Sequence, residues 1–160
     1  AETMTLLIQN NTINAGGGDD RIQFSVADSN GSNDVTISDN TVSNTSSEGI
    51  RFFLDDDDNE SPDLDLDVVD NTFVSIGDGA VELATRDTAT ACANVTANSD
   101  GAAGSLGPIL FDERDGSSIS VPQANTTAIT TANDGASVTI QTNPITFGAA
   151  PCAPTLPSHS

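Results

Sequence analysis

The chain has 160 residues and carries 24 acidic side chains against four arginines and no lysine, for a formal net charge of −20. A charge this negative repels nucleic acid and anionic membrane surfaces, and it attracts divalent cations. No apolar stretch reaches the length of a membrane span, so we expect neither nucleic-acid binding nor membrane insertion. Frequent valine, isoleucine and threonine, interrupted by glycine, asparagine and aspartate, predict an all-β protein.

A phrase of eight residues recurs along the first two thirds of the chain. Clear copies stand at residues 6–13 (LLIQNNTI), 35–42 (VTISDNTV) and 66–73 (LDVVDNTF), and a weaker copy stands at 93–100 (ANVTANSD). Each copy contains an asparagine, and these residues are Asn11, Asn40, Asn71 and Asn98, spaced 29, 31 and 27 positions apart. A repeat of this length predicts stacked supersecondary units.

A second apolar stretch follows each asparagine after about ten residues, at 22–24, 50–52, 81–83 and 109–111. Two strands and two turns per repeat predict a parallel β-helix of about four to six coils. Equivalent side chains would then stack about 4.8 Å apart, with Val35 between Leu6 and Leu66. The asparagines would form a ladder at one corner, bonded to backbone groups and to each other. A β-sandwich with Asn-Thr turns is the alternative, but its strands do not repeat in register.

The most acidic segment is 55–70, which holds nine carboxylates in sixteen residues. Calcium takes six to eight oxygen ligands, so we consider calcium a possible cofactor; none is required. The candidate ligands are Asp55, Asp56, Asp57, Asp58, Asp63 and Asp65. Because no calcium-binding motif is present, a solvated acidic loop is the alternative interpretation.

The repeat loosens after residue 122, so we divide the chain into β-helix coils at 1–122 and a C-terminal segment at 123–160. That segment is expected to add a strand near 136–141 and a proline-rich tail that packs on the β-helix. Cys92 and Cys152 predict one disulfide that ties this irregular segment down, with two free thiols as the alternative. A disulfide favours an oxidising, extracellular location. The first residue, Ala1, fits a processed mature end.

Residues 5–122 resemble the right-handed parallel β-helix repeat of pectate lyases, tailspikes and many bacterial surface proteins. The end of the chain, from CANVTANS through ILFDERDGSSISVP to Pro-Cys-Ala-Pro, resembles the C-terminal regions of large secreted bacterial β-helix proteins. This resemblance implies a secreted, bacterial, cell-surface protein, and it says little about activity.

We therefore expect a non-catalytic extracellular structural protein, either a cell-surface or adhesive module or a fibre subunit. The fibre version would stack head-to-tail with copies of itself, because no capping helix precedes Leu6 and β-helix ends expose backbone. Surface glycans are a second possible partner. The alternative is a glycan-binding or polysaccharide-degrading β-helix with lyase or hydrolase activity. Its candidate groups are Arg51 beside residues 55–58, and Arg114 with Asp112, Glu113 and Asp115, although sugar platforms of Trp or Tyr are absent.

Overall fold

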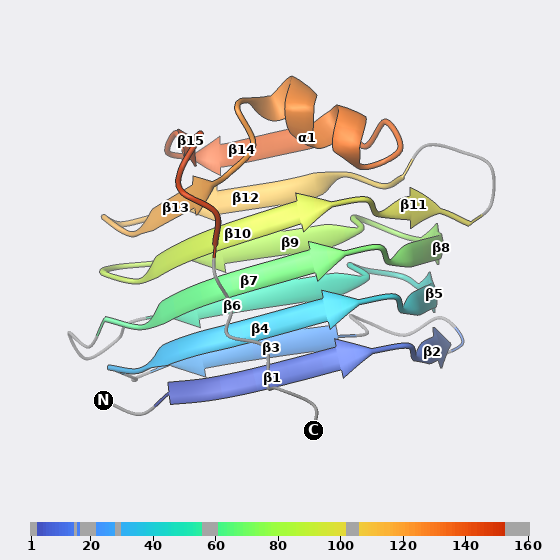
Figure 1. Ribbon diagram of the computed structural model, residues 1–160, viewed down its shortest axis with the longest axis horizontal. Helices are drawn as coiled ribbons and strands as arrows, with labels where there is room; N and C mark the ends of the chain where they lie inside the picture. Colours follow the sequence, from blue (N-terminus) through green and yellow to red (C-terminus); the bar gives the residue numbers. More distant parts are fainter. Residues whose placement is uncertain are drawn as a thin grey trace.

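The computed structural model describes residues 3–14, 16, 22–27, 30–55, 61–101 and 106–152. In these ranges the chain forms a parallel β-solenoid of about four turns, which confirms the predicted fold class. Successive coils stack as rungs from the N-terminal end at β1 to the C-terminal end near α1 and β14 (Figure 1). Within the described ranges no helix has the length and apolar character needed to cross a bilayer.

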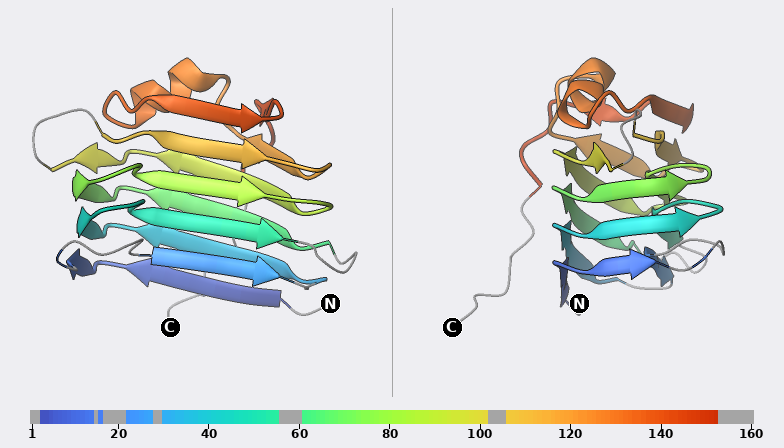
Figure 2. Two further views of the ribbon diagram at one scale, coloured as in Figure 1. Left: turned by 180° about the vertical axis from the view of Figure 1, so that it is seen from behind. Right: turned by 90° about the vertical axis from the view of Figure 1, so that its right-hand side faces the viewer.

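Three parallel sheets form the sides of the stack, with sheet A in front, sheet C behind it and sheet B at one side (Figures 1 and 2). Sheet A has the order β1 (Thr3–Gln9), β4 (Ser32–Ser38), β7 (Asp63–Val69), β10 (Thr90–Thr96), β13 (Ser118–Val121) and β15 (Thr146–Phe147). Sheet B has the order β11 (Ser99–Asp100), β8 (Thr72–Ile76), β5 (Thr41–Thr45) and β2 (Thr12–Asn14). Sheet C has the order β14 (Val138–Thr142), β12 (Ile109–Glu113), β9 (Val81–Thr85), β6 (Ile50–Asp55) and β3 (Ile22–Ala27).

Each of the first four coils therefore has three strands, whereas the sequence predicted two. The eight-residue phrase bends in its middle, and its last residues form the short strand of sheet B. The bend lies at the residue before each ladder asparagine, where the backbone adopts positive φ: Asn10, Asp39, Asp70 and Ala97 have φ of 59°, 55°, 57° and 57°. Asn and Asp tolerate this left-handed conformation better than other non-glycine residues, and for that reason the phrase turns a corner there.

The core is a set of apolar columns that run along the stack. Val35 pairs in register with Leu6 on one side and Leu66 on the other, as the repeat predicted. On sheet C, Phe52 pairs with Phe24 and Leu83. Side chains alternate along each strand, so every second residue enters the column and the intervening residue lies on the outer face. In the middle coils the inward side chains are fully buried.

The C-terminal end contains a helix that the sequence did not predict. Helix α1 (Thr126–Ala132) lies between β13 and β14, in the place of a sheet-B strand, and over the end of the stack (Figure 1). The Asn125 side chain caps it by accepting a hydrogen bond from the Ala128 N–H at 2.9 Å. Its Ile129 is 0% exposed and covers the core. The Ala- and Thr-rich sequence has one apolar anchor, which is too little periodicity to indicate a helix.

Candidate functional site

The four repeat asparagines meet at the corner between sheets A and B and form a hydrogen-bonded ladder. The Oδ1 of Asn71 accepts the backbone N–H of Asn40 at 3.1 Å and its Nδ2–H at 3.0 Å. The Nδ2 of Asn71 reaches the carbonyls of Ile37 and Val69 and the Oδ1 of Asn98, at 2.9–3.1 Å. Asn11 and Asn40 repeat the same pattern one coil earlier. Polar groups at this buried corner are thereby satisfied without water.

A fifth asparagine, Asn133, completes the ladder at the C-terminal end. Its Oδ1 accepts the Asn98 backbone N–H at 3.2 Å and the Asn98 Nδ2–H at 2.9 Å. Its own N–H donates to the Thr130 carbonyl at 3.3 Å, inside the end of α1. The ladder therefore ends in the helix rather than in an open corner.

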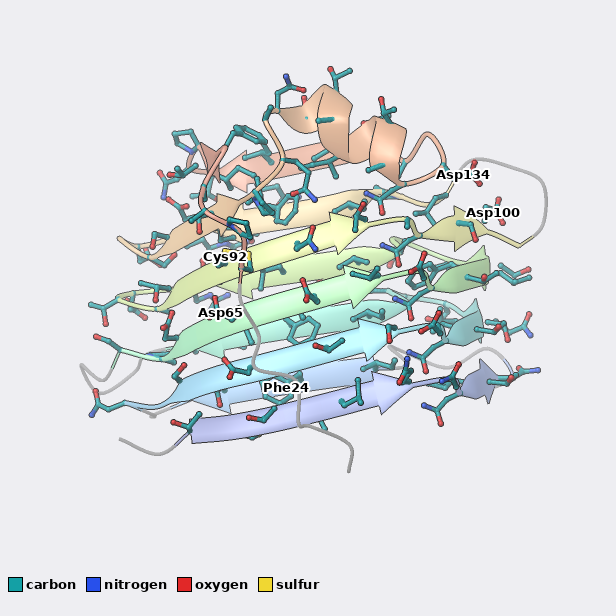
Figure 3. The ribbon with its side chains drawn as sticks, viewed as in Figure 1. Phe24, Asp65, Cys92, Asp100 and Asp134 are labelled. Atoms are coloured by element: carbon teal, nitrogen blue, oxygen red, sulfur yellow. A yellow bond between two sulfur atoms is a disulfide. The ribbon has the colours of Figure 1, made fainter. Side chains whose placement is uncertain are left out.

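The disulfide joins Cys92 on β10 to Cys152, with an S–S distance of 2.08 Å and a Cα–Cα distance of 5.4 Å. This finding confirms the predicted pairing. The bond fastens the C-terminal segment to the outer side of sheet A (Figure 3). In the chain-entropy picture a bridge across 60 positions stabilises the fold by about 4 kcal/mol.

An acidic patch occupies the outer face of sheet A around β7. Asp65 projects from this face beside the carboxylates of Asp63, Asp34 and Asp67 (Figure 3). Partial burial and then repulsion from these three carboxylates raise the pKa of Asp65. Burial also raises the pKa of Asp67, although a hydrogen bond from the Asn94 amide opposes the change. The patch therefore holds negative charge at an energetic cost.

The predicted calcium ligands are only partly placed by the structure. Asp63 and Asp65 are on β7 and Asp55 ends β6, whereas Asp56, Asp57 and Asp58 lie outside the described residues. Asp63 accepts a hydrogen bond from the Thr90 hydroxyl at 2.6 Å. Among the described residues, no group of three or more His, Cys, Asp or Glu side chains is arranged to hold a metal ion. Calcium at this segment stays a prediction.

The outer face of sheet C carries arginines paired with carboxylates, and we call it the arginine face. Arg51 on β6 forms an ion pair with Glu82 on β9 at 2.9 Å. Arg114 forms an ion pair with Asp112 on β12. The guanidinium of Arg86 lies 4.9 Å from the centre of the Phe53 ring. All three arginines that the structure describes thus lie on one side of this acidic chain.

The electrostatic environment of the arginine face stabilises carboxylates in their ionised, arginine-paired form, and it does not favour a general acid. Burial alone would raise the pKa of Asp112, but hydrogen bonds from Arg114 and Thr142 and the charges of Arg114 and Arg86 hold the pKa below its ordinary value. A general acid needs the opposite shift. Beside this face a shallow hollow is lined by Glu48, Asp78, Gly79, Pro108, Leu110, Thr139 and Gln141.

The enzymatic candidates named from the sequence are therefore only partly brought together. Asp112 and Arg114 are paired, and Arg51 pairs with Glu82, whereas Asp56, Asp57 and Asp58 lie outside the described residues. The repeat could have indicated the Arg51–Glu82 pair, because these two residues occupy equivalent positions in successive copies and pair in register. The sequence could also have indicated Asn133 as a member of the ladder, because the tripeptide Thr-Ala-Asn occurs at 96–98 and again at 131–133.

Comparisons of the chain with protein-family models, with curated proteins and with solved structures returned no match.

Proposed function

We propose that the chain is a non-catalytic extracellular structural module, a rigid β-solenoid segment of a cell-surface or adhesive protein. The observation that carries the proposal is the asparagine ladder (Asn11, Asn40, Asn71, Asn98 and Asn133), which runs through every coil and ends in α1. Its members are 0–1% exposed at Asn40, Asn71, Asn98 and Asn133, so they serve the backbone and offer nothing to a ligand. A continuous buried ladder makes a stack stiff along its axis, which suits a spacer or scaffold.

The location of the module is part of the same proposal. The Cys92–Cys152 disulfide supports an oxidising, extracellular compartment. The resemblance of the repeat to bacterial β-helix surface proteins supports the cell surface, and the acidic outer face of sheet A supports solubility at high local concentration.

Of the two versions of the structural hypothesis, a module is favoured over a head-to-tail fibre. A fibre would need the last coil of one copy to receive the first coil of the next. Helix α1 lies over that last coil, and its Ile129 is fully buried against the core. Electron microscopy of the purified chain at high concentration tests this point. We expect single particles, and filaments with a repeat of one module would overturn the choice.

A glycan-acting β-helix is the second candidate, and the arginine face is the observation that favours it. Arg51 with Glu82, and Arg114 with Asp112, lie on neighbouring strands of one sheet, beside a shallow hollow. Acidic and neutral polysaccharides should be screened for turnover and for binding, with Glu82→Gln and Asp112→Asn as variants and Asp100→Asn as the distant control. We expect no turnover; activity lost in the first two variants and kept in the control would replace the structural proposal.

A further inference from the structure

The two ends of the stack differ in how they are finished. At the N-terminal end, β1, β2 and β3 form the first coil, and we call the surface of this coil that faces away from β4 the open end (Figure 1). At the C-terminal end α1 covers the interior, although β14 remains an edge strand of sheet C. The open end has no such element among the described residues.

Three apolar side chains at the open end are less buried than their register partners in the next coil. Leu6, Ile8 and Phe24 are partly exposed, whereas their register partners Val35, Ile37 and Phe52 are each 0% exposed. A small hollow opens between β1 and β3, with those three buried side chains at its base. Figure 3 labels Phe24 close to this lower end of the stack. One more layer of side chains would complete each column.

The direction of the hydrogen bonds in the ladder determines the strand direction that this added layer must have. In each later coil, an asparagine Oδ1 accepts two N–H groups from the asparagine one coil earlier. Asn11 is exposed, and its Oδ1 has no donor among the described residues. The Nδ2 of Asn40 also reaches back to the Ile8 carbonyl of the preceding coil, at 2.9 Å. Asn11 has no such carbonyl in the described part of the chain.

These observations together define the missing partner. We propose that the open end binds one further coil of parallel β-solenoid, which runs in the same direction as β1 and carries an asparagine in register with Asn11. Its asparagine donates the backbone N–H and the Nδ2–H to the Oδ1 of Asn11. Its apolar side chains cover Leu6, Ile8 and Phe24. This inference rests on the proposed structural function and names the partner of the module.

A second copy of the chain does not meet the same requirements. In a head-to-tail contact the donors would have to come from Asn133, but its backbone N–H is already bonded to the Thr130 carbonyl at the end of α1. In a two-fold head-to-head contact, the Asn11 of the partner copy would again present an acceptor at the open end. Only a coil of the same direction supplies the donors.

The test adds such a coil to the full chain. A copy of residues 32–62 is fused directly before Thr3, because Thr3, Ser32 and Asp63 occupy the same register position. Asn11→Ala is then made in the fused and in the unfused chain. We expect this substitution to raise the unfolding equilibrium constant about tenfold more in the fused chain, since it then removes the acceptor of two partly buried donors on the added asparagine. Amide hydrogen exchange in β1 should slow in the fused chain as well.

A fusion with a shuffled version of the same 31 residues is the matched control, and there the effect of Asn11→Ala should equal that in the unfused chain. Equal effects of Asn11→Ala in the fused, shuffled and unfused chains would overturn the inference. So would a concentration-dependent dimer of the unfused chain that protects β1 from exchange, because the partner would then be a second copy. Turnover of a polysaccharide by the unfused chain would contradict the proposed structural function. It would leave the difference between the effects of Asn11→Ala in the fused and unfused chains unchanged, so the two failures can be told apart.

Discussion

Asn71→Ala is the substitution that probes the ladder most sharply. Asn71 is 0% exposed and lies in the middle of the ladder. Removing its amide leaves the backbone N–H of Asn40 without its acceptor and removes one of the acceptors of the Asn40 Nδ2. It also takes a donor from the carbonyls of Ile37 and Val69. An orphaned buried polar group costs about 1–3 kcal/mol, so we expect Asn71→Ala to lower the free energy of unfolding by about 3–5 kcal/mol.

Two comparisons make this measurement specific to the ladder. Asn11→Ala removes the same side chain from an exposed position and should cost under about 1 kcal/mol. Asn71→Asp keeps the acceptor and loses the donor, so a carboxylate would face the Ile37 and Val69 carbonyls. It should be as damaging as alanine near neutral pH and should recover partly in acid, where the protonated side chain can donate. Urea titrations followed by circular dichroism give the three free energies. Equal costs for Asn11→Ala and Asn71→Ala would refute the reasoning.

Three further predictions concern the corner, the acidic patch and calcium. Ala97→Asn should raise the free energy of unfolding by about 1 kcal/mol, because Ala97 is exposed and holds a φ of 57° that asparagine adopts more readily; an unchanged urea midpoint would contradict this. Asp65→Asn should raise the thermal midpoint near neutral pH. The raised pKa means that the folded state disfavours this carboxylate above its folded pKa, so the gain should fade as the pH drops through that pKa towards about 4; a gain independent of pH would count against it. Millimolar calcium should raise the thermal midpoint and a chelator should reverse the rise, with magnesium as the control; the absence of a shift would remove the calcium hypothesis.

The repeat made most of the fold predictable. The spacing of the asparagines and of the second apolar stretch placed Val35 against Leu6 and Leu66, because side chains in stacked parallel strands pair residue by residue. The short strands of sheet B were missed because two to five residues after a left-handed corner are too few to show alternation. Helix α1 was missed because its only fully buried residue is Ile129, so its sequence lacks an apolar stripe.

The candidate site was less predictable, for a physical reason. Acidic residues adjacent in sequence look like a site, yet side chains on the outer face meet across strands and not along them. Arg51, for example, pairs with Glu82, which lies 31 positions away in the sequence and in register on the next strand. The spacing of 27 to 31 positions between the other ladder asparagines does not identify Asn133, because α1 lengthens that coil and 35 positions separate Asn133 from Asn98.

Residue-level hydrogen exchange of the native chain tests the central claim most directly, namely that a ladder-bound stack is closed at one end by α1 and open at the other. The free energy of opening should be lowest for the amides of β1, rise through β4 to β7, and stay high through β10 and at Ile129 of α1. Faster exchange at Ile129 and at the Asn98 corner than in β1 would contradict the account.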